Sequence, residues 1–597
     1  MDFDATVHVA DLTVSPDGRR LAFTSERRVA VLNLGDGELS PGASGSCPRW
    51  SPSGDRLAWI TEDGRAFLDG PVDIPGTVES LAWSPDGRKL LLVVAEPGAE
   101  LSDVFGSGRL PGDDDRPSWA PLVDDGGHGG GRRRAWIYDL AEASARCVSD
   151  ANVWQAVWAG TRILCVTSPG PSESDWYGAR LALLEPLTPL LETEDQVAVP
   201  AASPSGERLS AVVGAMSDRG LYVGQLTIVG HGVVDTGGVD VTDQAWLDED
   251  RVIFAGLRGL DTVVGIFHLG TGTVEVLWES EQTCGDYLPA VSAGGGVVAA
   301  VVHSYSSPPA IALIAGGKAV PCLEPNAHLP DAVGTLEPVH WTAPDGTPVS
   351  GLLALPPGAG PYALVVHVHG GPVWAWRDEW AMHGPYTPLL VGGGYAVLHV
   401  NMRGSAGHGQ EFIRAGLLDM GGADASDFTS GVDALVAAGL VDPARVGITG
   451  NSYGGFMAAW LAATTDRFAA VVARSPVTDW VSQHHASNLP GFDRRCLSGD
   501  PLDAASAYRA RSPLYLADQV RAPMMLMAGA QDLATPPEQA AMFHRALIEH
   551  GRASTLVIYP EEGHGVRQQA ALADQCARML AFFDRHMPAV GRDWAGE

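Results

Sequence analysis

The sequence GNSYGG at residues 450–455 places a serine among glycines, where an apolar stretch gives way to a helical one. The preceding residues 446–449 (VGIT) predict a buried strand, and residues 456–463 (FMAAWLAA) predict a helix. A sharp turn from strand to helix lifts a serine hydroxyl above the edge of a sheet, and glycines let neighbouring backbone approach closely. Ser452 is therefore a candidate nucleophile for acyl transfer.

A serine hydroxyl becomes an effective nucleophile only when a base removes its proton, and that base needs an orienting acid. His564 follows the apolar stretch at residues 555–558, and Asp532 follows the stretch at residues 524–529. Both lie after predicted parallel strands, at the edge where doubly wound sheets place their active sites. A helix cap for Asp532 and a surface position for His564 are the alternatives. The chain order Ser452, Asp532, His564 favours a catalytic triad.

The oxyanion formed on an attacked carbonyl needs backbone N–H donors, each worth about 3–4 kcal/mol in the transition state. Tyr453 is one candidate, because its N–H begins the predicted helix and the helix dipole favours negative charge there. The second donor should come from residues 369–372 (HGGP), which end the predicted strand at residues 364–368.

Other residue patterns offer little further chemistry. His367 and His369 alternate on one predicted strand, but no third ligand has a suitable spacing, so no metal is expected. Lys89 and Lys318 are the only lysines, and neither completes a phosphate-binding loop. The seven cysteines form no CxxC pair, which argues against a zinc ribbon. We expect no cofactor.

The candidate triad lies in a region that alternates strands with helices. Apolar stretches such as residues 364–368, 396–400 and 446–448 are separated by stretches rich in alanine and leucine. This pattern predicts a mostly parallel sheet covered on both faces. Strands flanking the turn at residues 345–346 should add an antiparallel edge. We predict a doubly wound α/β-hydrolase domain at residues 334–597.

The N-terminal region carries an internal repeat of an apolar stretch, a turn of the type SPDG or SPSG, and a second apolar stretch. Proline presets φ and glycine takes a positive φ, so each copy predicts a β-hairpin. Spacings of about 33 to 45 residues, with one wider gap, fit four-stranded blades. We predict a seven-bladed β-propeller at residues 1–333. Clear copies begin at Leu12, Arg49, Leu81 and Ala202, and weaker ones lie at residues 157–160, 245–248 and 291–294.

The wider gap holds residues 113–134, which are rich in aspartate, glycine and arginine. This composition cannot bury a core, and we interpret the segment as a loop between blades three and four. The arginines at 132–134 could bind an acidic group, but solvated side chains are the more common outcome for such a cluster.

The chain has 39 lysines and arginines against 71 aspartates and glutamates, which makes a net charge of −32. This charge repels phosphate backbones and anionic bilayers, so we expect neither a nucleic-acid nor a membrane partner. No apolar stretch approaches the roughly 18–20 residues that cross a membrane, and the acidic N-terminus lacks a secretion signal. A cytoplasmic location is therefore expected.

Several short motifs follow one another in a specific order through the predicted hydrolase domain. As a set they resemble the prolyl oligopeptidase family of serine peptidases, in particular its acylaminoacyl-peptidase and dipeptidyl-peptidase-like branch. The upstream repeats agree with the propeller of that family. The motifs are HGGP at 369–372, NMRGSAGHG at 401–409, VDPARV at 441–446, GNSYGG at 450–455, SPLY at 512–515 and GHG at 563–565.

The resemblance implies roles for the candidate residues. Ser452 would be the nucleophile, Asp532 the orienting acid and His564 the general base. The backbone of Tyr453 and of Gly371 would donate to the oxyanion. The resemblance also implies that the propeller restricts entry to short peptides.

Three further residues are candidates for binding substrate. Arg403 could hold a substrate carboxylate or carbonyl, and an internal ion pair is an equal alternative. Trp374 and Trp480 could form an aromatic pocket, although large aromatic side chains mostly serve packing.

Motifs and resemblance together imply a serine hydrolase that cleaves an amide bond near the N-terminus of short peptides, of the acylaminoacyl, dipeptidyl or oligopeptidase type. The alternative is an esterase or amide hydrolase acting on a small acylated metabolite, because the same triad performs both reactions. A non-catalytic propeller protein would be expected to lack part of the triad. We expect a short peptide or small acylated substrate, and a homo-oligomer is compatible with the sequence.

Overall fold

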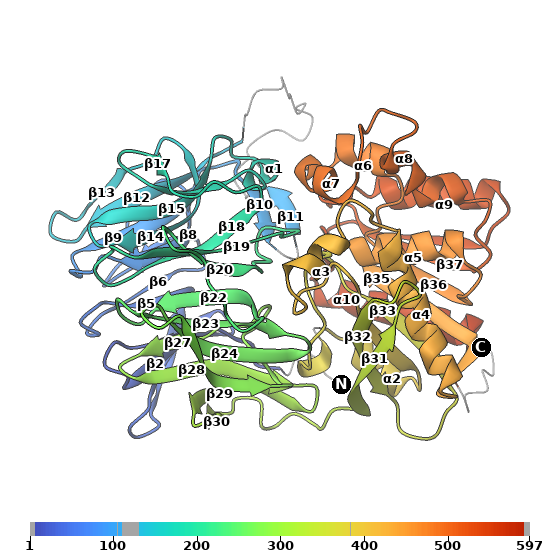
Figure 1. The fold of residues 1–597 in the computed structure, drawn as a ribbon, viewed down its shortest axis with the longest axis horizontal. Helices are drawn as coiled ribbons and strands as arrows, with labels where there is room; N and C mark the ends of the chain where they lie inside the picture. The colour runs from blue at the N-terminus through green and yellow to red at the C-terminus, as the bar shows by residue number, and fades with distance from the viewer. Residues whose placement is uncertain (1–5, 104–105, 110–129, 383, 590–597) are drawn as a thin grey trace.

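The computed structural model describes residues 6–103, 106–109, 130–382 and 384–589. Seven small sheets of three to five strands, with one further two-stranded sheet, form one unit, and a single large sheet flanked by helices forms the other, beside it (Figure 1). The last strand of the small sheets ends at Leu323, and the first strand of the large sheet begins at Thr335. None of the helices in the described residues is long and apolar enough to cross a membrane.

The seven small sheets are the blades of a β-propeller, which confirms the predicted fold. Their antiparallel strands follow one another along the chain. The blades consist of β1–β4 (Val9–Val14, Arg20–Ser25, Arg28–Asn33, Leu39–Ser44), β5–β7 (Ser46–Trp50, Leu57–Ile60, Ala66–Phe67), β8, β9, β12 and β13 (Thr77–Trp83, Lys89–Ala95, Arg133–Asp139, Ser144–Cys147), β14–β17 (Asn152–Ala159, Arg162–Ser168, Arg180–Leu183, Thr188–Pro189), β18–β21 (Gln196–Ala202, Leu209–Gly214, Gln225–Ile228, Gly232–Val233), β22–β25 (Asp240–Trp246, Arg251–Arg258, Asp261–His268, Thr273–Ser280) and β26–β30 (Thr283–Cys284, Ser292–Gly294, Val297–Ser304, Ser307–Ala315, Lys318–Leu323).

The repeated SPDG and SPSG turns join the first two strands of four blades, as the sequence predicts. In each turn the glycine N–H donates to the carbonyl of the serine three residues earlier, at 2.8–2.9 Å. Each glycine has a positive φ between 69° and 77°, a region that side chains disfavour. The glycines are Gly18, Gly54, Gly87 and Gly206.

The ring closes without a shared strand, because blades one and seven are each built from one continuous stretch of chain. Val9, Leu21 and Phe23 pack with Ala299 and Ile311 in one buried cluster. Two hydrogen bonds from one side chain add to this contact. Asn326 accepts the Val7 N–H at 2.7 Å and donates to the Val7 carbonyl at 3.0 Å.

The position of the long insertion corrects the sequence interpretation. Strand β12 pairs with β9, so the insertion joins the second and third strands of blade three instead of linking blades three and four. The physical reason is that buried and partly exposed residues alternate along β12. The buried Ala135 and Ile137 pack against neighbouring strands, so β12 forms part of blade three. Two short paired strands, β10 (Glu100–Asp103) and β11 (Gly106–Arg109), belong to the insertion. Residues 113–129 lie outside the described residues.

The arginines at 132–134 are not a solvated cluster. Arg133 is completely buried, and its Nε donates to Glu79 at 2.8 Å. Arg134 donates to Glu96. The prediction of solvated side chains was wrong because strand β12 of blade three begins at Arg133, so the cluster is part of the sheet.

The large sheet has eight strands in the order β31-β32-β34-β33-β35-β36-β37-β38. The first two strands are antiparallel to their neighbours, and all later pairs from β34 and β33 onward are parallel. This confirms the predicted α/β-hydrolase fold with its antiparallel edge. The strands are β31 (Thr335–Thr342), β32 (Pro348–Leu355), β33 (Tyr362–Val368), β34 (Ala396–Asn401), β35 (Val441–Asn451), β36 (Ala470–Arg474), β37 (Met524–Gly529) and β38 (Ser554–Tyr559).

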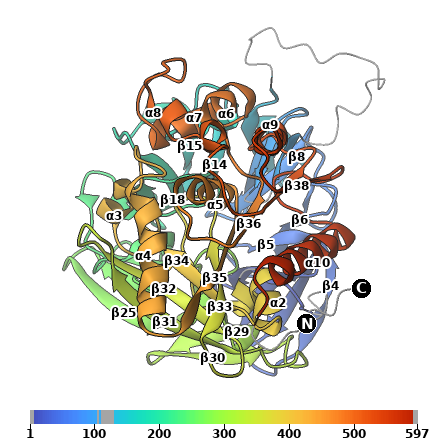
Figure 2. The same cartoon turned by 90° about the vertical axis from the view of Figure 1, so that its right-hand side faces the viewer.

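Helices cover both faces of this sheet. Leu364 and Val366 of β33 pack on one face with α4, α5 and α9, whereas Ala363 and Val365 pack on the other with α2 and α10. Figure 2 shows α4 and α10 on opposite sides of the strands. The helices in the described residues are α1 (Glu173–Trp176) in the propeller, then α2 (Tyr386–Gly392), α3 (Gln410–Ala415), α4 (Ala423–Ala437), α5 (Tyr453–Thr464), α6 (Trp480–Ala486), α7 (Pro490–Cys496), α8 (Ala507–Ala510), α9 (Glu538–Glu549) and α10 (Gln569–His586), with 3₁₀ helices η2 (Trp380–Met382) and η3 (Pro513–Leu516).

Polar contacts tie the propeller to the loop that follows β34. Asp240 Oδ2 accepts the N–H groups of Gly407 at 2.8 Å and Gly409 at 2.9 Å. Burial raises the pKa of the Asp240 carboxyl, although the two donors oppose this shift. Arg495 donates to the backbone carbonyl of Tyr177 in the propeller. These contacts hold the two domains around the cavity described below.

Replacing Asn326 by alanine should weaken ring closure. The substitution leaves the N–H and carbonyl of Val7 without these partners, at a cost of about 1–3 kcal/mol. We expect the first thermal unfolding transition to fall by about 2–5 °C. Asn33→Ala, which removes an exposed turn contact, should change stability by less than about 0.5 kcal/mol. Equal transition temperatures for the two variants would contradict a closing role for Asn326.

Candidate active site

Ser452 stands at the turn between β35 and α5, in a strained backbone conformation. Its φ of 61° and ψ of −120° lie in a region that costs a residue with a side chain about 1–3 kcal/mol. Neighbouring glycines make this turn possible, because a Cβ at Gly454 would collide with the carbonyl of Val368. A Cβ at Gly450 would lie 2.5 Å from the Gly454 backbone. The Ser452 N–H donates to the Arg474 carbonyl at 3.1 Å.

His564 and Asp532 meet at the carboxyl edge of the sheet, after β38 and β37. His564 Nδ1 lies 2.8 Å from Asp532 Oδ2. The other carboxylate oxygen, Oδ1, accepts the backbone N–H groups of Ala534 and Thr535, both at 2.9 Å. The Thr535 hydroxyl also donates to Oδ2 at 2.9 Å. These hydrogen bonds fix the position of the Asp532 carboxylate. Because this carboxylate engages Nδ1 of His564, Nε2 of the imidazole is the nitrogen that can exchange protons.

The structure brings the three predicted triad residues to one site. Ser452 and His564 line the same cavity, and Asp532 is buried behind the imidazole. Among the described residues, no hydrogen bond joins Ser452 Oγ to His564. In hydrolases this bond commonly tightens only when substrate is bound.

The charges of the site favour an ionised acid and a basic imidazole. Burial alone would raise the pKa of Asp532, but the charge and hydrogen bond of His564 and the donors from Thr535 lower it below 3.8. Burial alone would lower the pKa of His564, but Asp532 and the nearby carboxylate of Asp218 raise it above 6.5. Burial raises the pKa of Asp218 itself to about 6.

The two predicted oxyanion donors flank the nucleophile. Tyr453 is the first residue of α5, and Gly371 belongs to a turn beside Ser452, since a Cβ on neighbouring Gly370 would lie 3.7 Å from Ser452 Cβ. Gly371 has a φ of 107°, which suits only glycine. Among the described residues, neither the Tyr453 N–H nor the Gly371 N–H donates to a protein acceptor. Both donors are thus available to a ligand.

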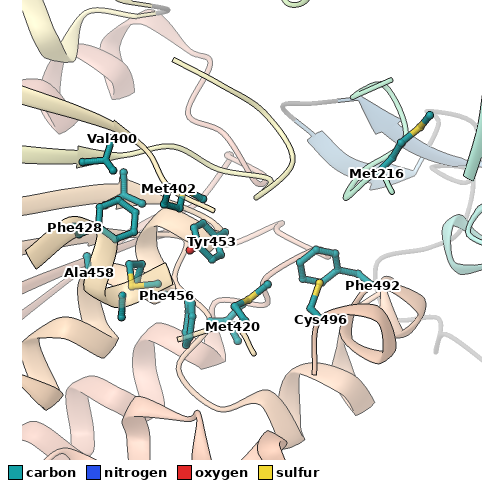
Figure 3. Packing of buried hydrophobic residues seen from close by; sticks show 14 of the residues in the cluster. Met216, Val400, Met402, Met420, Phe428, Tyr453, Phe456, Ala458, Phe492 and Cys496 are labelled. Atoms are coloured by element: carbon teal, nitrogen blue, oxygen red, sulfur yellow. The ribbon is translucent and has the colours of Figure 1, made fainter. Parts of the chain in front are cut away.

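The Tyr453 side chain anchors this helix start in the core. Tyr453 and Phe456 of α5 lie in the same buried cluster as Met402 and Phe428 (Figure 3). The Tyr453 hydroxyl donates to Asp424 at 2.8 Å. The backbone N–H predicted to face the oxyanion therefore belongs to a buried residue that is held by packing and by a hydrogen bond.

The cavity around Ser452 has a volume of about 310 Å³ and lies between the two domains. The propeller contributes Asp218, Arg219 and Tyr287 to its wall. An apolar lobe in the hydrolase domain is lined by Val477, Trp480, Leu489 and Phe492. The wall of this cavity is therefore built from both domains.

Two of the three predicted substrate-binding residues line this cavity. Trp480 belongs to the apolar lobe, and Trp374 lies beside the HGGP turn. The Trp374 indole is stacked on Tyr287 of the propeller and donates to the Tyr287 carbonyl at 3.2 Å. Both tryptophans are also buried, which is compatible with the packing role, and their binding of substrate stays a prediction.

Arg403 does not line the cavity, which corrects its prediction as a substrate-binding residue. Its guanidinium donates to Asp427 at 2.7 and 3.0 Å and also binds Asp345. Asp427 is fully buried and requires a cationic partner. The internal ion pair, the second interpretation of Arg403, is the one that the structure supports.

Several residues of the site carried no clear sequence signal. Thr535 has a weak one, since a threonine three residues after an aspartate can join the same turn. Asp218 and Tyr287 come from the propeller, about 230 and 160 residues before the nucleophile, and only folding brings them to it. In the described residues no cluster of three or more histidine, cysteine or acidic side chains is placed to hold a metal.

A strained serine turn, an acid-oriented imidazole and two free backbone donors at the carboxyl edge of a doubly wound sheet define the active-site geometry of a serine α/β-hydrolase, here joined to a propeller. Residues 383–589 match the model of the prolyl oligopeptidase family, and they form a domain of that family.

Comparison with individual proteins adds to this family match. The chain is 33% identical over 259 residues to the uncharacterized peptidase YuxL of Bacillus subtilis, covering 42% of this chain and 39% of that protein. It is 31% identical over 379 residues to dipeptidyl aminopeptidase BIII of Pseudoxanthomonas mexicana, covering 60% and 52%. These matches therefore span about two fifths and one half of the length of the two relatives.

Solved structures match over nearly the whole chain. An acylaminoacyl peptidase of Pyrococcus horikoshii aligns with a TM-score of 0.80 at 20% identity, over 100% of this chain and 98% of the other. A puromycin-hydrolyzing peptidase of Mycobacterium tuberculosis aligns with a TM-score of 0.76 at 19% identity, over 99% and 96%. These similarities show that the order and arrangement of the two domains are shared.

The raised pKa of His564 predicts the pH dependence of any hydrolysis at this site. The reaction needs a neutral imidazole, so kcat/KM should fall about tenfold per pH unit as the pH decreases below the His564 pKa. The midpoint of the profile should lie above 6.5, the usual histidine pKa. Asp218→Asn should shift this midpoint to lower pH, because a carboxylate that favours the imidazolium is removed.

Asp235→Asn is the matched control, since Asp235 is an exposed carboxylate in a propeller turn. It should leave the midpoint unchanged. A flat profile between about pH 5 and pH 8 would contradict the role of His564 as the base.

Proposed function

We propose that this chain is a serine peptidase that cleaves an amide bond near the N-terminus of short peptides, through an acyl-enzyme on Ser452. The observation that carries the proposal is the convergence of Ser452 and the Asp532-bound imidazole of His564 on one cavity beneath the propeller. Curated relatives named acylamino-acid-releasing enzyme, 27% and 28% identical over their aligned regions, support an amide substrate.

The geometry supports a reaction in two steps. His564 Nε2 takes the proton of the Ser452 hydroxyl while Oγ attacks the substrate carbonyl, and the imidazolium then protonates the leaving nitrogen as the C–N bond breaks. A water molecule repeats the sequence on the ester: His564 takes its proton as the water oxygen bonds to the acyl carbon. The imidazolium then returns the proton to Ser452 Oγ as the bond between Oγ and the acyl carbon breaks and the acid leaves. Asp532 stays ionised throughout and holds the imidazole.

The oxyanion of each tetrahedral intermediate would be held by the N–H groups of Tyr453 and Gly371. Both belong to backbone that is already constrained, Tyr453 by the packing of α5 and Gly371 by its turn. Donors that need no reorganisation during the reaction stabilise the transition state more than the ground state.

The cavity supports short substrates with an apolar side chain next to the scissile carbonyl. Its volume of about 310 Å³ suits a few residues, and the lobe around Trp480 and Phe492 offers an apolar surface. Asp218 places a carboxylate in the same cavity. It would accept an N–H from the substrate, whether from a free amine or a blocked one.

The other expectations stay predictions from the sequence. The lack of nucleic-acid and membrane partners rests on the strong negative charge. A cytoplasmic location is a separate prediction that does not depend on this charge. A homo-oligomer remains compatible with the chain.

Replacing Ser452 by alanine should abolish the reaction. Removal of the nucleophile should lower kcat by more than about 10⁴-fold and prevent labelling by a fluorophosphonate, with no loss of thermal stability. Ser426→Ala is the matched control, because Ser426 lies on α4 outside the cavity and its hydroxyl donates to the Ala423 carbonyl in the same helix. Full activity or labelling of the Ser452→Ala protein would refute the proposal.

A substrate panel separates the peptidase from the esterase alternative. We expect hydrolysis of acetylated amino-acid anilides or free dipeptide anilides that carry an apolar residue before the anilide, at kcat/KM values above those for anilides with an acidic residue there. The reason is the apolar wall of the lobe. Turnover of simple aryl esters with no turnover of any anilide would favour a small-metabolite esterase instead.

A further inference from the structure

A buried arginine without a carboxylate partner lies in the cavity wall next to the nucleophile. Arg474 is the last residue of β36, is 6% exposed and lines the cavity. Its Nη2 lies 3.1 Å from His367 Nε2, and its Cζ lies 3.9 Å from the centre of the Tyr386 ring. Its Nε has no hydrogen-bond partner. Among the described residues no carboxylate lies within 4 Å of this guanidinium.

The other buried arginines in the described part of the chain are compensated. Arg133 pairs with Glu79, Arg377 with Glu379 and Arg403 with Asp427. A buried charge without a counter-charge is costly, and proteins retain one mainly where it binds something. Arg474 is thus the exception among these side chains.

His367 does not supply the missing negative charge. Burial, together with the nearby His399 and Arg474, lowers the pKa of His367 well below 6.5, so its ring is neutral. Its Nε2 accepts a hydrogen bond from Arg474, which places the ring proton on Nδ1, and Nδ1 has no partner either. The imidazole positions the guanidinium and leaves its charge uncompensated.

Arg474 belongs to a second lobe of the cavity, on the other face of the sheet from the apolar lobe. Trp480 and Phe492 pack with α5 on one face. Val472, two residues before Arg474 and on its side of the strand, packs with α10 on the opposite face. The second lobe is lined by His367, Tyr386, Arg474, Met527, Leu572 and Gln575.

The position of the general base assigns the leaving group to this second lobe. His564 must protonate the leaving nitrogen, and the loop after His564 runs directly into α10. Leu572 and Gln575 of α10 line the second lobe, whereas the apolar lobe lies across the sheet edge. A substrate with its carbonyl at Ser452 therefore places its acyl part near Trp480 and its leaving part near Arg474.

We propose that Arg474 binds the free α-carboxylate of a short leaving group, so that the enzyme prefers substrates ending in an unblocked carboxylate soon after the scissile bond. This inference rests on the proposed function of the same site. A guanidinium presents N–H donors in a fork that matches a carboxylate, and only one of its donors is engaged by His367. Tyr386 stacks on the guanidinium and keeps its plane fixed.

Paired substrates test the proposal. N-acetyl-phenylalanyl-alanine carries the carboxylate, its C-terminal amide lacks only the charge, and N-acetyl-phenylalanine 4-nitroanilide has no carboxylate at all. The wild-type protein should cleave the acid with a kcat/KM about 10- to 100-fold above that of the amide, the range expected for charged hydrogen bonds. High salt should reduce this preference.

The variant Arg474→Met replaces the apolar stem of the side chain and removes the guanidinium and its charge. It should raise KM for the acid, abolish the preference over the amide, and leave anilide hydrolysis and fluorophosphonate labelling within about twofold. Arg474→Lys should recover part of the preference. Arg467→Met is the matched control: Arg467 pairs with Asp433, lies outside the cavity and should not affect the ratio.

Two results would overturn the role of Arg474. One is a wild-type protein that cleaves acid and amide equally well, which needs no variant to observe. The other is a variant in which all three substrates lose activity in parallel, as a purely structural residue would cause. If the wild-type protein instead cleaves none of the three substrates and is not labelled at Ser452, the proposed function fails, and that outcome is distinct from both.

Discussion

The backbone of Ser452 is the constraint on which the rest of this molecule depends. A serine at φ 61° and ψ −120° is strained, and it persists only because β35, α5 and the HGGP turn surround it. Glycines at 450 and 454 let these elements approach to contact distance. The same packing presents the Tyr453 N–H, positions Gly371, and joins the Ser452 N–H to the Arg474 carbonyl. One local distortion thus organises nucleophile, oxyanion donors and the neighbouring strand end.

Some buried charged groups stabilise the fold by pairing inside the protein, whereas others are available to accept a proton or to bind a ligand. Arg403 with Asp427, and Asp240 with its two glycine donors, satisfy each other inside the protein. Asp532 satisfies the imidazole of His564, which stays ready to accept a proton. Arg474 is a third case, a cation beside Ser452 whose contacting neighbours His367 and Tyr386 are neutral. In a chain with net charge −32, a pocket with a free cation selects acidic groups against the surrounding field.

Predictions from the sequence succeeded where the feature depends on adjacent residues, and they failed or stayed open where it depends on contacts between distant segments. The SPDG turns, the strand-turn-helix at Ser452 and the strand-end positions of Asp532 and His564 depend on a few adjacent residues, and the structure contains each of them. The insertion was misplaced because pairing of β12 with β9 joins segments about 40 residues apart. Arg403 was open to two interpretations because its partner Asp427 lies 24 residues away, on a helix whose facing side is set by packing.

The sequence by itself predicted the residues and order of the candidate triad, the seven repeats and the alternation of strands and helices, because these depend on local periodicity and turn chemistry. Only the tertiary structure determined which charged side chains pair with one another. It closed the propeller over the nucleophile, brought Asp218 and Tyr287 to the cavity, neutralised Arg403 and left Arg474 uncompensated. The physical reason is that burial and charge pairing depend on distances between segments far apart in the chain, which no local pattern of residues encodes.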